Sequence, residues 1–260
     1  SDFIDREGAV RIQKERIKKI LVMSLSNLGD IILTFPVIDI LRRDFDQADL
    51  SVMVGPKGKT LLIDNPKIDH LYVYDKGMPV NNKIRWAMEL RKEQFDFIID
   101  LRHTILPVLL APRYRTPLLR RRLQNEHARD QHLRVLYSVH PADLSRERFS
   151  FFCSEKEQEA LKTLLSGRMA EGDRFIVMAP GAADHRKRWT EEGFAETADF
   201  FARENGMKIV FVGADTDTET VSRVTARMRI SPIDLSGQAS LTQAGHLLTK
   251  AALAVVNDSC

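Results

Sequence analysis

The chain has 260 residues, of which 43% are hydrophobic and 29% charged, and its 39 Lys and Arg against 36 Asp and Glu leave a net charge of +3. This composition is typical of a globular protein and excludes a collagen, a coiled coil or a wholly disordered chain. Two cysteines, Cys153 and Cys260, cannot form a disulfide scaffold, and no apolar run approaches the roughly 18 residues that cross a bilayer, so we expect a protein of a reducing compartment without a transmembrane helix.

The first half of the chain alternates short apolar runs with helical patterns. Strands are predicted at 18–25, 50–55, 70–75 and 95–101, and helices at 30–45, 57–64 and 81–93. This rhythm predicts a parallel sheet that is covered by helices on both faces. The stretch 102–150 contains four prolines and is less regular, with one helix expected at 127–139.

A second series of the same kind begins at residue 174. Strands are predicted at 174–180, 208–213, 233–237 and 253–258, and helices at 190–204, 216–228 and 240–250. We therefore predict an α/β protein of two Rossmann-like domains, 1–150 and 173–260, joined by a hinge at 151–172. Because the last strand should lead into another helix, we expect the second domain to be incomplete at its C-terminus.

The first candidate site is the turn Ser26-Asn27-Leu28-Gly29-Asp30, between the first strand and the first helix. Ligands of α/β sheets bind beyond the carboxyl ends of the strands, so Asp30 is expected in the cleft, where it can accept a proton from a hydroxyl group. The alternative is that Asp30 only caps the helix. No G-x-G-x-x-G fingerprint of a dinucleotide site occurs here.

The second candidate site is the loop 180–190, which follows the first strand of the second series. Gly181 and the two alanines that follow it expose backbone N–H groups, and the cations Arg186, Lys187 and Arg188 lie beside the start of a helix. Both features favour an anion such as a diphosphate. The alternative is a solvated basic loop that is capped by Thr190.

Two further loops carry polar groups at strand ends. Asp215-Thr216-Asp217 spells D-x-D, which holds a divalent metal in some sugar transferases, but here it begins a helix. Capping is therefore the alternative, and a contact with ribose hydroxyls is the more plausible function. The segment 256–260 follows a hydrophobic strand and is expected either to bind phosphate or to form an ordinary turn.

The positive charge is concentrated in one segment. Eight arginines and two acids between Arg102 and Arg134 give that segment +6, so the rest of the chain sums to −3. The planar guanidinium group of arginine can donate two parallel hydrogen bonds to a phosphate or carboxylate group, so this segment predicts a small anionic ligand. The alternative is a solvated basic helix face. Few aromatic residues lie between the arginines, so we expect no nucleic-acid partner. His and Cys spacing also predicts no zinc site.

Taken together, these motifs resemble glycosyltransferase family 9, the ADP-heptose:lipopolysaccharide heptosyltransferases, over nearly all of 18–260. The segments that carry the resemblance are KKILVMSLSNLGDIILTFPVIDILRRDFDQADLSVMVG, EHARDQHLRVL, PGAADHRKRWTEEGFAETADF and LSGQASLTQAGHLLTKAALAVVNDS. The resemblance implies a GT-B fold and a metal-independent, inverting transfer from a nucleotide-activated heptose, with no cofactor.

The resemblance also implies roles for particular residues. Asp30 would be the general base on the acceptor hydroxyl. The donor residues would be Gly181, Lys187 and Arg188 near the diphosphate, Asp215 near the ribose, and Asp258 and Ser259. The residues on the acceptor side would be Ser26, Asn27, Arg120, Arg122 and His127.

The implied partners are a nucleotide sugar and the anionic inner core of lipopolysaccharide, so the enzyme would work in the cytoplasm at the inner membrane surface of a Gram-negative bacterium. Cys260 stands where the family usually has Gly. The alternatives are therefore a family member with another nucleotide sugar, or a degenerate, non-catalytic protein that binds a glycan or an anion.

Overall fold

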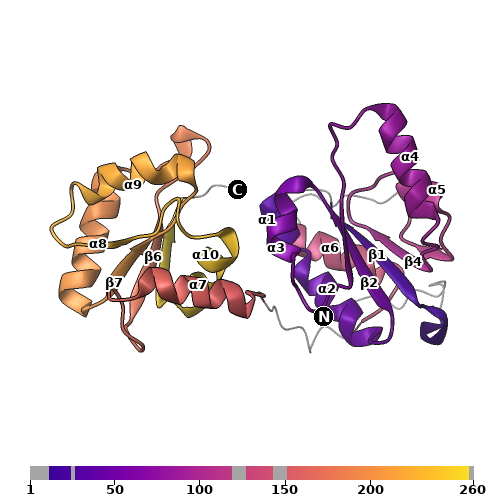
Figure 1. Ribbon diagram of the computed structural model, residues 1–260, viewed down its shortest axis with the longest axis horizontal. Coiled ribbons are helices and arrows are strands. Elements are labelled where there is room, and N and C mark those ends of the chain that lie inside the picture. Colours follow the sequence, from indigo (N-terminus) through magenta and orange to yellow (C-terminus); the bar gives the residue numbers. More distant parts are fainter. Residues whose placement is uncertain (1–11, 25–26, 119–126, 143–150, 258–260) are drawn as a thin grey trace. The chain divides into compact units, whose positions relative to one another are not determined.

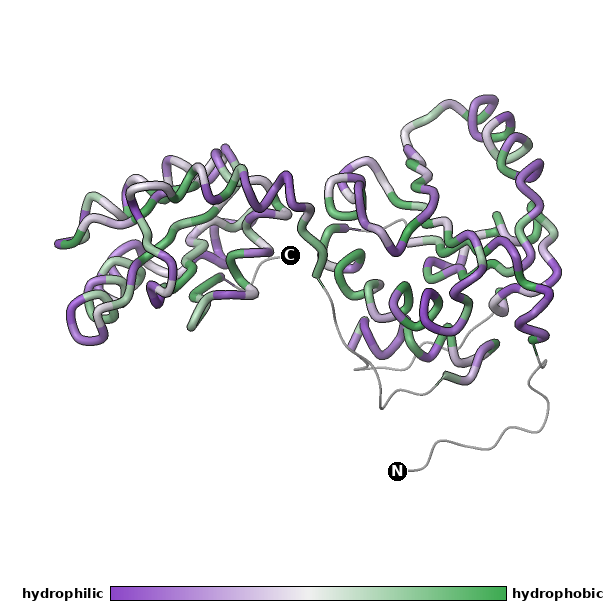
Figure 2. The backbone as a smooth tube through the Cα atoms, turned by 60° about the horizontal axis from the view of Figure 1, so that its bottom comes forward, coloured by the Kyte–Doolittle hydropathy of each residue, from purple (hydrophilic) through white to green (hydrophobic). Residues whose placement is uncertain are grey.

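The chain folds into two compact units, residues 1–150 (unit 1) and residues 151–260 (unit 2) (Figure 1). The computed structural model describes residues 12–24, 27–118, 127–142 and 151–257. Figure 2 shows hydrophobic stretches of backbone running through the sheet of each unit.

The centre of unit 1 is a sheet of five parallel strands in the order β3-β2-β1-β4-β5. The strands are β1 (Lys19–Ser24), β2 (Asp49–Val54), β3 (His70–Val73), β4 (Phe97–Asp100) and β5 (Tyr114–Arg115). In the register of the sheet, Val22 of β1 lies beside Val52 of β2 and Ile99 of β4, and all three are fully buried. Strands that are buried on both faces are continuous apolar runs, which is why the sequence pattern located them correctly.

Helices cover both faces of this sheet. They are α1 (Leu28–Ile32), α2 (Phe35–Asp44), α3 (Lys59–Leu62), α4 (Val80–Arg91), α5 (Leu106–Leu110) and α6 (Ala128–Tyr137), with short 3₁₀ turns η1 (Lys14–Arg16) and η2 (Pro56–Gly58). Leu21 and Met23 of β1 pack in one cluster with Leu90 of α4 and Leu110 of α5. Figure 1 shows α1, α2 and α6 on the opposite side of the sheet.

The single helix expected at 30–45 is in fact two helices. Helix α1 ends at Ile32, and α2 begins at Phe35, with Pro36 in its first turn. Proline has no N–H to donate inside a helix but is well tolerated at a helix start. The Thr34 hydroxyl, at the junction, lies 2.9 Å from the Asp30 carbonyl oxygen and 2.8 Å from the buried Ser24 hydroxyl.

Unit 2 repeats the same plan with four parallel strands in the order β8-β7-β6-β9. The strands are β6 (Phe175–Ala179), β7 (Lys208–Phe211), β8 (Ile233–Asp234) and β9 (Leu253–Val256). The helices are α7 (Glu155–Leu165), α8 (Glu191–Asn205), α9 (Thr218–Thr225) and α10 (Leu241–Lys250), with 3₁₀ turns η4 (His185–Lys187) and η5 (Asp215–Asp217).

Alternation along the strands of unit 2 separates two hydrophobic clusters. Ile176 and Met178 of β6 pack with Phe194 of α8 and Val221 of α9. Phe175 and Val177 of the same strand belong to the other cluster, which includes Leu161 of α7 and Leu247 of α10. Successive side chains of a strand point to opposite faces, so α8 and α9 cover one face of the sheet and α7 and α10 the other.

The segment 151–172, which we expected to be a hinge, contains a regular helix. Ser154 caps α7 by accepting a hydrogen bond from the Glu157 N–H at 3.3 Å, and Leu161 is buried in the core of unit 2. The functions that we assigned to the two predicted domains stay predictions.

Both sheets reverse their strand order at one point. The first crossover goes from β1 to β2 on one side, and the chain later returns to β4 on the other; in unit 2, β7 and β9 flank β6 in the same way. Ligands of open α/β sheets bind at such switch points, beyond the carboxyl ends of the strands. The residues after β1, β4, β6 and β9 are therefore expected to line the ligand-binding sites of the two units. Within the described ranges, no helix is both long enough and apolar enough to cross a membrane.

Candidate active site

At the switch point of unit 1, Asp30 faces an arginine from the neighbouring strand end. Helix α1 begins after Asn27, which occupies the N-cap position without a side-chain cap hydrogen bond, and Asp30 lies in the first turn. The Arg102 Nη1 lies 3.4 Å from the Asp30 Oδ2, and both side chains are about one-third exposed (37% and 33%). Asp30 is therefore not the N-cap residue, and its carboxylate is accessible beside a cation.

The loop that carries Arg102 is held by Asp100, the last residue of β4. The Asp100 side chain is buried, and its carboxylate accepts hydrogen bonds from the Arg102 N–H at 2.8 Å and from the Thr104 N–H and hydroxyl at 2.5 and 3.0 Å. The Asp100 N–H donates a hydrogen bond to the Thr116 hydroxyl oxygen at 3.0 Å. Sequence analysis missed this aspartate, although an acidic residue at the end of a buried strand often organises the turn that follows.

Helix α6, which belongs to the predicted acceptor side, is anchored on the same region. His127 is its N-cap residue, and the His127 Nδ1 accepts a hydrogen bond from the Arg129 N–H at 3.3 Å. The buried His132 ring lies with its Nδ1 3.2 Å from the Leu33 carbonyl oxygen, at the end of α1. Burial is the largest cause that lowers the pKa of His132. The helix is thus tied to the turn that follows Asp30.

Only part of the predicted acceptor set can be placed. Asn27 and His127 lie at the starts of α1 and α6, as described above. Ser26, Arg120 and Arg122 lie outside the described residues.

In unit 2, the loop after β6 contains three consecutive basic residues whose surroundings differ. The Arg186 guanidinium is paired with both oxygens of Asp184, at 2.8 to 3.2 Å, and this hydrogen bonding lowers the pKa of the Asp184 carboxyl. Lys187 is exposed and has no ion pair or side-chain hydrogen bond within the described residues. Of these two cations, Lys187 is therefore the one that remains available to an anionic ligand.

The third basic residue, Arg188, holds the loop in place. Its Nε and Nη2 donate to the Ala182 carbonyl oxygen at 3.0 and 2.8 Å, and its Nη1 donates to the Thr220 hydroxyl at 3.3 Å. The side chain thus links the loop to α9. Arg188 was predicted to bind the donor, and its observed partners are protein groups of the loop and of the neighbouring helix.

The two aspartates of the D-x-D sequence also differ in whether protein groups already engage their side chains. The Asp217 carboxylate accepts a hydrogen bond from the Ala214 N–H at 3.0 Å, and it fills the space beside Gly181, where any side chain would collide with it. The Asp215 carboxylate has no hydrogen bond to a described residue and lies near Gly237. Asp217 therefore shapes the loop, whereas Asp215 can still bind hydroxyl groups.

Metal ligation by this pair finds no support in the described ranges. No three His, Cys, Asp or Glu side chains are grouped there in a way that could hold a metal ion. The absence of a metal requirement stays a prediction.

A buried amide joins the two strand ends at the switch point of unit 2. Asn257, directly after β9, is 8% exposed. Its Nδ2 donates to the Pro180 carbonyl oxygen at 2.8 Å, and its Oδ1 accepts from the Trp189 N–H at 2.9 Å. Asn257 thus fixes both ends of the loop that holds Lys187. Asp258 and Ser259, the predicted donor residues that follow it, lie outside the described residues.

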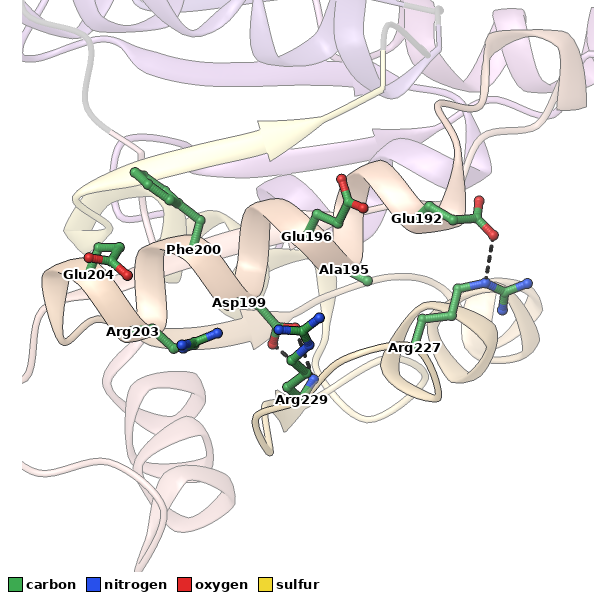
Figure 3. Close-up of a pocket in the computed structure, with 9 residues that line it drawn as sticks. All are labelled: Glu192, Ala195, Glu196, Asp199, Phe200, Arg203, Glu204, Arg227 and Arg229. Atoms are coloured by element: carbon green, nitrogen blue, oxygen red, sulfur yellow. Dashed lines mark hydrogen bonds and ion pairs between the residues drawn. The ribbon is translucent and has the colours of Figure 1, made fainter.

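The cavity drawn in Figure 3 is separate from these loops. It has a volume of about 450 Å³, and none of the predicted site residues lines it. Arg227 is paired there with Glu192 at 2.9 Å, and the Asp199 carboxylate accepts hydrogen bonds from the backbone N–H groups of Arg229 and Ile230. These charges already stabilise the contact between α8 and the segment after α9, so the cavity is not a candidate active site.

Together, the fold and the strand ends define a class of protein. Two Rossmann-like units with parallel sheets, one with a carboxylate at its switch point and the other with a loop suited to anions, are typical of GT-B glycosyltransferases. Comparison with known proteins identifies the family.

The family model described as glycosyltransferase family 9 (heptosyltransferase) matches residues 114–260. The chain belongs to this family, and it is a glycosyltransferase. The predicted fold class and the resemblance are thereby confirmed, whereas the roles of the individual site residues stay predictions.

Two relatives with assigned functions align with most of the chain. The lipopolysaccharide core heptosyltransferase OpsX of Haemophilus influenzae is 23% identical over 261 residues, which cover 94% of this chain and 75% of the relative. The lipopolysaccharide heptosyltransferase 3 of Escherichia coli is also 23% identical, over 260 residues that cover 89% of this chain and 74% of the relative.

Solved structures agree on the fold. A family 9 glycosyltransferase from Veillonella parvula superimposes with a TM-score of 0.79 at 28% identity, covering 93% of this chain and 75% of that one. The ADP-heptose lipopolysaccharide heptosyltransferase II of E. coli gives a TM-score of 0.74 at 22% identity, covering 93% and 79%.

Proposed function

We propose that this enzyme transfers a heptose from ADP-heptose to the inner core of lipopolysaccharide, with inversion at the anomeric carbon and without a metal ion. The observation that carries the proposal is the family membership of a chain whose two strand-end sites present an accessible carboxylate in unit 1 and an unpaired lysine in unit 2. Both relatives are named as lipopolysaccharide heptosyltransferases, which supports heptose as the transferred sugar and lipopolysaccharide as the acceptor.

Asp30 would act on the acceptor. The acceptor oxygen attacks the anomeric carbon, the bond from that carbon to the diphosphate oxygen breaks, and the hydroxyl proton passes to the Asp30 carboxylate. A carboxylate can serve as base in such a concerted step because the hydroxyl becomes acidic as the new bond forms. Arg102, 3.4 Å away, would hold the carboxylate in one orientation.

The loop after β6 would bind the donor. Lys187 and the backbone N–H groups near Gly181 would neutralise the charge that develops on the departing ADP. Asp215 would accept hydrogen bonds from the ribose hydroxyls, and Asp258 and Ser259 would hold the diphosphate from the end of β9. Arg188 would contribute through the loop that it fixes.

The acceptor would be anionic and linked to a lipid. Arg120, Arg122 and His127 would bind its phosphate or carboxylate groups, because arginine forks match such anions. An enzyme with this acceptor would work at the cytoplasmic face of the inner membrane as a peripheral protein.

The test is an assay of ADP release with purified protein, ADP-heptose and lipopolysaccharide that lacks heptose, in the presence of a chelator. We expect ADP to form only when both substrates are present, and NMR of the product to give the anomeric configuration opposite to that of the donor. Release from a different nucleotide sugar, but not from ADP-heptose, would reject the proposed donor. Binding of both substrates without any ADP release would indicate a non-catalytic protein.

A further inference from the structure

Exposed apolar side chains are concentrated on one part of unit 1. Of the seven large hydrophobic side chains that are exposed among its described residues, six belong to α4, to α5 and to the N-cap residue of α5. They are Val80 (68% exposed), Ile84 (56%), Met88 (64%), Ile105 (64%), Val108 (39%) and Leu109 (50%). Single exposed hydrophobic residues are normal on a protein surface, but a group of six is not.

Helix α4 has a second apolar side that already serves the core. Trp86 and Leu90 pack against the sheet with Leu110 of α5. Val80, Ile84 and Met88 follow one another at intervals of four residues, so they form a separate row along the outer surface of the helix. Core packing therefore does not explain this row.

Cations flank the apolar row. Helix α4 and its C-cap residue carry four basic residues against one acid, Glu89, which gives this segment a charge of +3. The basic residues are Lys83, Arg85, Arg91 and Lys92. Glu89 is already bonded to Lys92 at 2.8 Å, and Arg85 and Arg91 have no ion pair in the described part of the chain.

Helices α4 and α5 lie side by side on one face of the sheet of unit 1. Both helices contribute to the hydrophobic cluster on one face of the sheet, and they contact each other. Figure 1 shows them together on the side of the sheet opposite to α1 and α2. Residues that point away from the sheet on α4 and α5 therefore lie on a common side of unit 1.

We propose that this docking face, formed by the six exposed residues and the cations of α4, binds the surface of an anionic phospholipid membrane. An apolar row that is bordered by Lys and Arg is the pattern of a helix that lies in the plane of the interface, with its hydrophobic side chains among the acyl chains and its cations at the headgroups. Charge complementarity favours lipid as the occupant over an apolar protein surface, which would leave the cations unpaired.

The inference rests on the proposed function in one respect: a lipid-linked acceptor explains why a transferase would need such a face. Binding itself requires neither the sugar donor nor the acceptor. A failure of the membrane assay and a failure of the transfer assay are therefore distinguishable.

The test is flotation of the full chain with phosphatidylcholine vesicles that contain 30% phosphatidylglycerol, on the order of the anionic content that attracts basic helices. We expect the protein to float with these vesicles, much less with pure phosphatidylcholine, and less at high salt. The double variant Ile84→Ser with Met88→Ser should lower the partition coefficient by about tenfold or more, since each side chain loses most of its apolar surface.

The matched control is Ile63→Ser, which removes an exposed isoleucine from unit 1 outside α4 and α5. It should float like the unchanged protein. Arg85→Glu with Arg91→Glu should abolish the dependence on anionic lipid, and circular dichroism of each variant reports whether it folds. Equal flotation of the unchanged protein and the Ile84/Met88 variant, or no flotation of either, would overturn the proposal. Conversion of a dimer into a monomer by that variant, with flotation unchanged, would assign the face to a second copy of the chain.

Discussion

The two units have the same strand order around their switch points, but they join the strand ends by different chemistry. In unit 1, the ends of β1 and β4 are joined by an ion pair between Asp30 and Arg102, with both side chains about one-third exposed. In unit 2, the ends of β6 and β9 are joined by the neutral amide of Asn257, which is buried and bonded to backbone groups.

This difference suits opposite tasks. An exposed ion pair contributes little to stability, so it can rearrange when a substrate arrives and leave the carboxylate to accept a proton. A buried amide that satisfies backbone groups is costly to disturb, so it fixes the shape of a loop. Unit 1 thus presents an accessible carboxylate, whereas unit 2 presents a fixed loop in which Lys187 has no ion pair among the described residues. Five predictions test this contrast.

The largest effect is expected at Asp30. Asp30→Ala should lower the rate of heptose transfer by about 10²- to 10⁴-fold, the usual contribution of a general base, and should leave ADP binding unchanged. The measurements are turnover by ADP release and ADP affinity by calorimetry. Asp49→Ala, which changes an exposed aspartate at the start of β2, is the matched control. Unchanged turnover in the Asp30 variant would remove it from the mechanism.

The next effect compares two neighbouring cations of the loop after β6. Lys187→Ala should weaken ADP binding by about 10- to 100-fold, because a charge-assisted hydrogen bond to the diphosphate is lost. Arg186→Ala should change the affinity by less than about threefold, since its guanidinium is paired with Asp184 on the surface. Calorimetry with ADP measures both, and equal losses in the two variants would contradict the distinction.

Arg102 should matter for turnover rather than for donor binding. Arg102→Gln is expected to lower kcat by about tenfold, because the Asp30 carboxylate loses the charge-assisted contact that orients it. Arg102→Lys should restore part of the rate. Arg113→Gln, at an exposed arginine that lies over the Tyr114 ring, serves as control. A rise in the acceptor KM with kcat unchanged would instead make Arg102 a ligand of the acceptor.

Asn257 should affect stability first. Asn257→Ala leaves the Pro180 carbonyl and the Trp189 N–H without their partner, which should lower the free energy of unfolding by about 1–3 kcal/mol. Urea unfolding measures this change. Asn205→Ala, at the exposed end of α8, should be neutral. A neutral Asn257→Ala would show that the amide does not fix the loop.

The smallest effect concerns pH. Burial lowers the pKa of His132 and of His140 in unit 1. Below a pH of about 6.5, the usual pKa of histidine, these two side chains therefore bind fewer protons in the folded state than in the unfolded chain. The unfolded state then holds more protons, and stability falls as the pH drops through that value. Asp44, paired with His140 and with its own pKa lowered, acts in the same direction at lower pH.

Hydrogen exchange can locate this loss of stability. Between pH 7 and pH 5.5 the amides of β1 and β4 should lose more protection than those of β6 and β7, after correction for the intrinsic exchange rates. In the described part of unit 2 only the partly buried His246 has a lowered pKa among the titratable histidines. A larger loss of protection in β6 and β7 would contradict the prediction.

The sequence was most informative where local physics fixes the structure. The strands at 18–25 and 174–180 were predicted because a parallel strand that is buried on both faces must be a continuous apolar run. The helix expected at 30–45 was wrong in one detail, since the pattern of apolar residues does not reveal the break before Pro36. The hinge expected at 151–172 contains a helix because Leu161 has a core to pack against, which local periodicity does not report.

The sequence by itself determined the two Rossmann-like halves, the positions of the loops at the strand ends and the resemblance to the transferase family. Only the tertiary structure decided which residues in those loops are already engaged. Asp30 meets Arg102 across 72 positions of the chain, and Asn257 meets Pro180 across 77. The same structure separates Lys187 from Arg186 and Asp215 from Asp217, which are chemically alike in the sequence. The physical reason is that a side chain's partners depend on which strand ends the sheet brings together, and parallel strands bring together residues that are far apart along the chain.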